Sequence, residues 1–232
     1  MKLNELNYLL DLKYGNILKE HQDQIDNADK VFSKYAKYFK DEPYPLPEST
    51  RKEIHNLIAI QKDKMGSSDW KDIKEFIEAC DEEPLSVMEQ YCQSIEVDFK
   101  KAYFEKVMNK ISGFILILKK HYNRPRPYQV AFYTEQNFNP LYSSSAISPA
   151  YPSGHTIQAY FICRIIAFHN PEKKDEIMNL AKMIADSREI LGVHYESDNL
   201  FSRYIVDELC KIKEIEDIYF NPKKLKKEKQ DS

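Results

Sequence analysis

The chain has 232 residues and a formal net charge of -3, with 34 Lys and Arg side chains against 37 Asp and Glu. Hydrophobic residues make up 42% of it, which is enough for a compact core and excludes global disorder. Because the charges nearly cancel, the chain as a whole is not attracted to nucleic acid, and we expect no nucleic-acid partner. A membrane span needs about 20 apolar residues, and the longest apolar run here, residues 114–118, is much shorter.

The N-terminus and the cysteines indicate the compartment. The first 15 residues have acidic side chains inside their apolar stretch and no small-residue cleavage site, unlike a signal peptide. We therefore expect a soluble protein, cytoplasmic or otherwise intracellular, without a transmembrane segment. The four cysteines form no CxxC pair, and we interpret them as free thiols in a reducing compartment. They are Cys80, Cys92, Cys163 and Cys210.

The first hundred residues have the spacing of charged, amphipathic helices. Only five glycines occur in the whole chain, which favours helix over sheet. Three prolines in residues 41–49 must interrupt a helix. Further helix starts are predicted at Ser49 or Thr50, at Ser68 or Asp69, and at Pro84.

The second half alternates long helices with one irregular stretch. A long helix is predicted from about Val97 to Lys120, followed by an irregular segment over 121–152 that holds five of the 11 prolines. Helices are expected to resume at about 153–169, 171–191 and 195–214. Residues 222–232 are rich in lysine and are predicted to form a basic, disordered tail.

Candidate chemistry is concentrated in three segments where a predicted helix meets a loop: residues 119–127, 151–155 and 186–198. Ser153 follows a proline and is a natural helix cap, so the N–H groups after it would face an anion at a helix N-terminus. Gly154 has no side chain to obstruct that approach.

His194 and Asp198 form the second part of this pattern. We expect Gly192 to end the 171–191 helix in a left-handed conformation, which places His194 at the start of the next helix. Asp198 would then share one helix face with His194 and fix its tautomer. Three cations lie in the same segments, and the complete set suits a tetrahedral oxyanion. These cations are Lys119, Arg126 and Arg188.

The spacing of these residues resembles the three-part signature of the type 2 phosphatidic acid phosphatase superfamily. That superfamily includes soluble bacterial acid phosphatases, lipid phosphate phosphatases and vanadium-dependent haloperoxidases. The resemblance covers about residues 119–198 and does not extend to the first hundred residues. The matching positions are Lys119, Arg126 and Pro127; Pro152, Ser153, Gly154 and His155; and Ser187, Arg188, His194 and Asp198.

The resemblance implies an all-α, single-domain helical bundle of the acid phosphatase/vanadium haloperoxidase type. Residues 1–221 would form this one domain. Within it, residues 1–100 are a helical cover and residues 101–221 are the core that carries the motifs.

The resemblance also implies a role for each matching residue. His194 would attack phosphorus and form a phosphohistidine, Asp198 would orient His194, and His155 would protonate the leaving oxygen and then activate water. No metal ion would be needed, because three cations, a serine hydroxyl and a glycine N–H would bind the phosphate oxygens. These groups belong to Lys119, Arg126, Ser153, Gly154 and Arg188.

We therefore expect a metal-independent phosphatase that hydrolyses phosphate monoesters, works best at acid pH, is inhibited by vanadate and has no cofactor. Its substrate would be a small phosphate ester or a lipid phosphate, and its oligomeric state stays open, with a homodimer one possibility. The first alternative is a vanadium-dependent haloperoxidase whose pocket holds vanadate. The second is a helical phosphate-binding module without turnover.

Other polar and aromatic residues near the motifs have weaker interpretations. His121 is interpreted as a surface or partly buried histidine that could contact the leaving group, and Arg124 as a cation at the rim or in solvent. Tyr142 and Tyr151 either line the substrate mouth or fill the core. The remaining histidines are interpreted as surface or partly buried: His21, His55 and His169.

Overall fold

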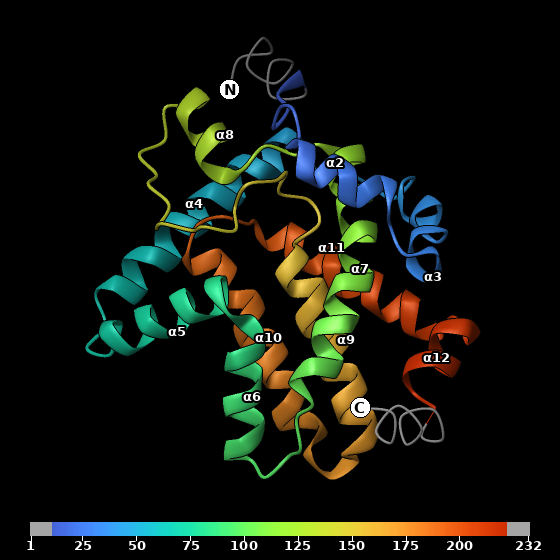
Figure 1. The fold of residues 1–232 in the computed structure, drawn as a ribbon. Coiled ribbons are helices and arrows are strands. Elements are labelled where there is room, and N and C mark those ends of the chain that lie inside the picture. The colour runs from blue at the N-terminus through green and yellow to red at the C-terminus, as the bar shows by residue number, and fades with distance from the viewer. Residues whose placement is uncertain (1–10, 222–232) are drawn as a thin grey trace.

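The expected all-α fold is confirmed. The computed structural model describes residues 11–221, and every regular element within that range is a helix (Figure 1). The predicted basic tail, residues 222–232, lies outside the described residues. None of the described helices is both long and apolar enough to cross a membrane.

The helices follow one another in this order: α2 (Lys19–Asp26), α3 (Lys30–Ser33), the 3-10 turn η1 (Ala36–Phe39), α4 (Pro47–Met65), α5 (Trp70–Glu82), α6 (Pro84–Ser94), α7 (Lys101–Tyr122), α8 (Pro127–Tyr133), α9 (Gly154–His169), the 3-10 turn η2 (Pro171–Lys173), α10 (Lys174–Ile190), α11 (Glu196–Lys211) and α12 (Lys213–Tyr219).

Helix α9 is the centre of the core. It packs against α7, α10 and α11, and its residues Ile157, Phe161 and Ile162 are completely buried. Burying one such side chain contributes about 1.5–3 kcal/mol. Helices α4, α5 and α6 lie on one side of this core, and α2, α3 and α12 lie on the other (Figure 1). The N-terminal end of α9, which carries one motif, is therefore enclosed by the bundle.

The starts of the N-terminal helices agree with the sequence in part. Asp69 is the N-cap residue of α5 and α6 begins at Pro84, as predicted. The predicted start of α4 at Ser49 or Thr50 is wrong, because the helix begins at Pro47. Proline is well suited to a first helical position, where its missing N–H has no helical partner.

The boundaries of later helices also differ from the predictions. Helix α7 begins at Lys101 rather than near Val97 and ends at Tyr122, and its C-cap residue Asn123 has a left-handed φ of 49°. The expected helix over 171–191 begins with the short turn η2, and the one over 195–214 is divided into α11 and α12.

The stretch predicted to be irregular, 121–152, contains one helix. Helix α8 begins at Pro127, where a proline again occupies the first position and starts a helix instead of preventing one. Residues 134–153 between α8 and α9 form the remaining loop.

All four cysteines are free thiols, as predicted. Three of them are buried, and burial raises the pKa of Cys80 to about 12 and that of Cys92 to about 11. They are neutral members of the core.

Candidate active site

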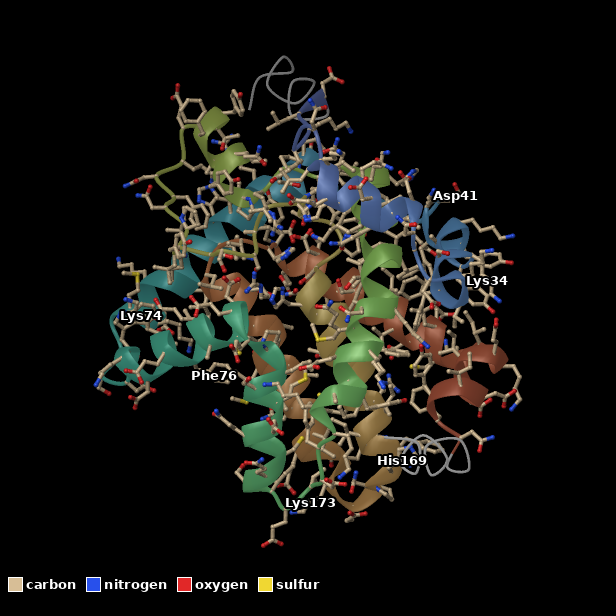
Figure 2. All side chains as sticks on the ribbon, viewed as in Figure 1. Lys34, Asp41, Lys74, Phe76, His169 and Lys173 are labelled. Atoms are coloured by element: carbon tan, nitrogen blue, oxygen red, sulfur yellow. The ribbon has the colours of Figure 1, made fainter. Side chains whose placement is uncertain are left out.

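The predicted cations are buried, unlike most charged side chains of the molecule. Figure 2 shows Lys34, Lys74 and Lys173 at its outer edge. In contrast, four cations inside the bundle are between 0% and 4% exposed. They are Lys119, Arg124, Arg126 and Arg188.

The turn after α10 explains the spacing between Arg188 and His194. Gly192 has a φ of 77°, so the left-handed end predicted for this helix is confirmed. The chain then folds back, and the backbone N–H groups of Val193 and His194 donate to the carbonyl of Arg188 at 3.2 and 3.4 Å. Arg188 and His194 are thereby fixed to one turn.

His194 lies in this turn and not at the start of the helix that follows. Helix α11 begins at Glu196 with Tyr195 as its N-cap residue, so the predicted shared helix face of His194 and Asp198 is wrong. Asp198 instead reaches back from the first turn of α11. Its Oδ2 accepts from the Nδ1 of His194 at 3.0 Å and from the backbone N–H of Tyr195 at 3.0 Å.

The contacts of His194 define its tautomer. Nη1 of Arg126 lies 3.0 Å from Nε2 of His194, and a guanidinium can only donate hydrogen bonds. Nε2 therefore accepts, and the ring proton is on Nδ1, which donates to Asp198. Burial and the nearby Arg126, Lys119 and Arg188 lower the pKa of His194 well below its usual value, which favours this neutral ring.

Lys119 and Arg126 line the same site and hold the loop before α9. The ammonium group of Lys119 donates to the carbonyl of Pro149, and Nε of Arg126 donates to the carbonyl of Ser148 at 2.8 Å. Burial and the charge of Arg126 lower the pKa of Lys119 well below its usual value. Burial and the charge of Arg188 lower the pKa of Arg126 to about 10. A bound anion would relieve this mutual repulsion.

Ser153 and Gly154 form the N-terminus of α9, as the sequence predicted. Ser153 is the N-cap residue, and its Oγ accepts from the backbone N–H of Thr156. A Cβ placed on Gly154 would lie 3.7 Å from Cε of Lys119, so the first and second motifs are adjacent. The backbone N–H of Ser153 donates to the carbonyl of Asp198 at 3.5 Å, which connects the second motif to the third.

His155 and the side chain of Arg188 lie beside the cluster but contact a residue that sequence analysis did not select. Nη1 of Arg188 donates to Oδ1 of Asp81 at 2.6 Å. Nε2 of His155 lies 3.4 Å from the backbone carbonyl of Asp81. Burial and the charge of Arg188 lower the pKa of His155 to about 3, so its ring is neutral when no anion is bound.

The segment that holds these residues matches a known protein family. Residues 107–206 match the family profile described as the PAP2 superfamily, and all the predicted site residues lie in that range. The chain is similar to this superfamily over that segment, which is less than half of its length.

Two known proteins are similar to the chain. A non-specific acid phosphatase of Providencia stuartii is 33% identical over 81 residues, which are 34% of this chain and 32% of that protein. The match thus spans about a third of that relative's length. The crystal structure of a transmembrane PAP2 type phosphatidylglycerolphosphate phosphatase from Bacillus subtilis covers 89% of this chain and 94% of its own, at 19% identity and a TM-score of 0.35.

Arg124 lies in the matched segment 107–206, and its position differs from the one that the sequence predicted. It was expected at the rim or in solvent, yet it is completely buried. Its Nη1 donates to Oδ1 of Asp198 at 2.5 Å and its Nη2 donates to Glu53 of α4 at 2.9 Å. The guanidinium also lies 3.8 Å from the ring centre of Tyr195. An Arg-Pro pair beside Arg126 was the only signal in the sequence.

Two opposing effects therefore act on the pKa of Asp198. Burial raises its pKa to about 6, while Arg124 favours the ionised form and limits that rise. Arg124 thus stands behind the aspartate of the PAP2 motif, on the side away from His194.

The remaining sequence candidates differ in their surroundings. His121 is exposed and its Nε2 contacts the carbonyl of Lys40, so the expected contact with a leaving group has no support. Tyr142 is 82% exposed, whereas Tyr151 is buried and stacks on Phe201. Among residues 11–221, no group of three or more His, Cys, Asp or Glu side chains is arranged to hold a metal ion.

Proposed function

We propose that this chain is a PAP2 phosphatase that hydrolyses phosphate monoesters through a phosphohistidine on His194. The observation that carries the proposal is the tautomer of His194. Its Nε2 has a lone pair aimed at Arg126, while Asp198 accepts the proton of Nδ1. A neutral imidazole with a carboxylate behind it is an activated nucleophile.

In the first step, Nε2 of His194 attacks phosphorus and the ester P–O bond breaks. Arg126, which now donates to Nε2, would donate to a phosphate oxygen instead. Lys119, Arg188 and the N–H of Gly154 would bind the phosphate oxygens with it. The cationic side chains among these groups are buried, so their interaction with the developing charge is strong. His155 gives a proton to the leaving oxygen.

In the second step, His155 takes a proton from water and the water oxygen attacks phosphorus. The N–P bond to His194 breaks, inorganic phosphate leaves, and His194 returns to its neutral form. Asp198 stabilises the imidazolium stage of His194 in both steps.

The proposed pH dependence follows from His155. The neutral ring of the anion-free site cannot protonate a leaving group. The negative charge of a bound phosphate favours the protonated ring and raises its pKa. Since that proton is held more fully at lower pH, the highest activity is expected on the acid side of neutrality.

The decisive experiment replaces the nucleophile. His194→Ala should lower phosphate release from p-nitrophenyl phosphate by about a thousandfold or more, the usual scale for losing a catalytic nucleophile. His121→Ala, at an exposed histidine of α7, is the control and should keep the activity of the unchanged protein. An active His194→Ala variant would refute the assignment.

Two further measurements define the class of reaction. Turnover that is unaffected by chelators and inhibited by vanadate supports a phosphate site built from protein cations. Halogenation in the presence of vanadate, bromide and peroxide would favour the haloperoxidase alternative. Because the Providencia relative is a non-specific acid phosphatase, small phosphate esters are the first substrates to test, followed by lipid phosphates.

A further inference from the structure

Asp81 is the residue of the site that the proposed reaction does not use. It lies in the last turn of α5 and is 5% exposed. Its carboxylate contacts Arg188 and its backbone carbonyl contacts His155. Arg188 and His155 are two of the groups that must reach the substrate phosphate in the proposed mechanism. One residue, Asp81, therefore contacts both of them.

The carboxylate of Asp81 lies in a complete set of donors. Oδ1 accepts from Nη1 of Arg188 at 2.6 Å, from Oγ of Ser145 at 2.5 Å and from Oγ of Ser143 at 2.7 Å. Oδ2 accepts from the backbone N–H of Ser144 at 3.0 Å and from its Oγ at 3.4 Å. A guanidinium, hydroxyls and a backbone N–H are also the donors that bind phosphate oxygens.

The donors are connected to each other as well as to Asp81. Nη2 of Arg188 donates to Oγ of Ser145 at 3.0 Å, so the serine segment 143–145 joins the carboxylate and the guanidinium. Nε of Arg188 is buried and has no hydrogen-bond partner. Of the five N–H donors of the guanidinium, Asp81 and Ser145 take one each, and the buried N–H of Nε stays available for an anion.

We infer that Asp81 competes with the substrate phosphate for Arg188 and thereby sets the affinity of the site for anions. The inference rests on the proposed function of Arg188. A carboxylate beside Arg188 cancels part of its charge and repels a second anion. Binding of phosphate therefore requires the Asp81–Arg188 pair to loosen, together with its serine contacts.

The test measures two constants in the full chain. They are the dissociation constant of inorganic phosphate, measured by calorimetry, and the Michaelis constant for p-nitrophenyl phosphate. Asp81→Asn keeps the shape of the side chain and removes its charge, so it should lower both constants at least tenfold, equal to about 1.4 kcal/mol. Glu82→Gln is the matched control. It removes one negative charge from the neighbouring, exposed residue of α5 and should change either constant less than twofold.

A second variant protects the test against a folding defect, because Asp81→Asn leaves Arg188 without its partner. Ser143→Ala removes one donor to Asp81 and leaves every charge in place, so it should tighten phosphate binding by a few-fold. Thermal unfolding checks that each variant is folded. Unchanged or weaker phosphate binding in the folded variants would overturn the inference and make Asp81 a residue that positions Arg188.

The outcomes also separate this inference from the proposed function. Tighter phosphate binding in Asp81→Asn, with no hydrolysis of any ester by the unchanged protein, would refute the phosphatase and support the competition. Hydrolysis that depends on His194, with equal phosphate affinity in the unchanged protein and Asp81→Asn, would support the phosphatase and refute the competition. If neither protein binds phosphate and neither hydrolyses the ester, both proposals are wrong.

Discussion

At the residue scale, the ionisation of Asp198 depends on Arg124. The nearly complete burial of this carboxylate favours its neutral form, and the guanidinium at 2.5 Å opposes that effect. Without the charge of Arg124, the pKa of Asp198 would be higher than its present value of about 6. In the proposed mechanism, a neutral Asp198 would no longer stabilise the imidazolium of His194.

Arg124→Gln should therefore move the acidic limb of the kcat/KM profile to higher pH and lower the activity at pH 6 about tenfold or more. The measurement is a pH–rate profile with p-nitrophenyl phosphate. Arg203→Gln, at an exposed arginine of α11, is the control and should keep the profile of the unchanged protein. If Arg124→Gln lowers activity equally at every pH, the arginine has only a structural role.

The sequence predicted these residues unevenly, for a physical reason. The motif residues are recognisable because each motif is a short segment with fixed spacing, and the turn after α10 shows why the spacing is fixed. The positions of Arg124 and Asp81 depend on partners 71 and 107 residues away, Glu53 and Arg188. Within α5, Asp81 is one acidic residue among several, and no local pattern distinguishes it.

At the scale of single elements, the end of α10 determines where His194 lies. Gly192 has a positive φ, and a Cβ on it would lie 2.5 Å from the ring of Phe138 and 2.8 Å from Nε2 of Gln61. Gln61 also donates to the carbonyl of Ile190, so the end of the helix is held from α4. Any side chain at residue 192 would strain this turn two residues before His194.

Gly192→Ala should lower the free energy of unfolding by about 1–3 kcal/mol and also lower kcat, because the turn that carries His194 must shift. Gly113→Ala is the matched variant. Its Cβ would lie 2.6 Å from Cβ of Ala28, where α7 meets the link between α2 and α3, so it should lower stability without lowering kcat. Denaturant unfolding and initial rates measure both quantities. Equal kcat losses in the two variants would argue against a local effect at His194.

The elements themselves were predictable where the local signal is strong. Apolar spacing predicted the long helices, and Ser153 and Gly192 predicted one start and one end. Prolines were misleading, because Pro47 and Pro127 occupy first helical positions and begin helices at places where an interruption was expected. One sequence cannot distinguish these two uses of proline.

At the scale of the whole molecule, a bundle with a net charge of -3 encloses a site rich in cations. Burial and neighbouring cations keep His155 and His194 neutral in the folded chain. In the unfolded chain both histidines would titrate near the ordinary value of about 6.5. The unfolded state therefore binds more protons as pH falls below that value, and stability decreases with decreasing pH.

Asp198 opposes this trend, because its raised pKa lets the folded chain bind a proton between about pH 4 and 6. Two histidines outweigh one carboxyl group, so the net effect is a loss of stability in acid. His155 alone accounts for about 1–2 kcal/mol between about pH 7.5 and 5. For a chain of this length, that corresponds to a change of about 3–6 °C in Tm.

His155→Gln should remove the contribution of His155 to the pH dependence of stability. In phosphate-free buffers, the difference in Tm between about pH 7.5 and 5 should be about 3–6 °C smaller than in the unchanged protein. His55→Gln, at an exposed histidine of α4, should leave the difference as it is. Added phosphate should restore stability at acid pH in the unchanged protein, because a bound anion lets the folded site hold the proton on His155. An equal pH dependence in all three proteins would show that His155 is not kept neutral by the fold.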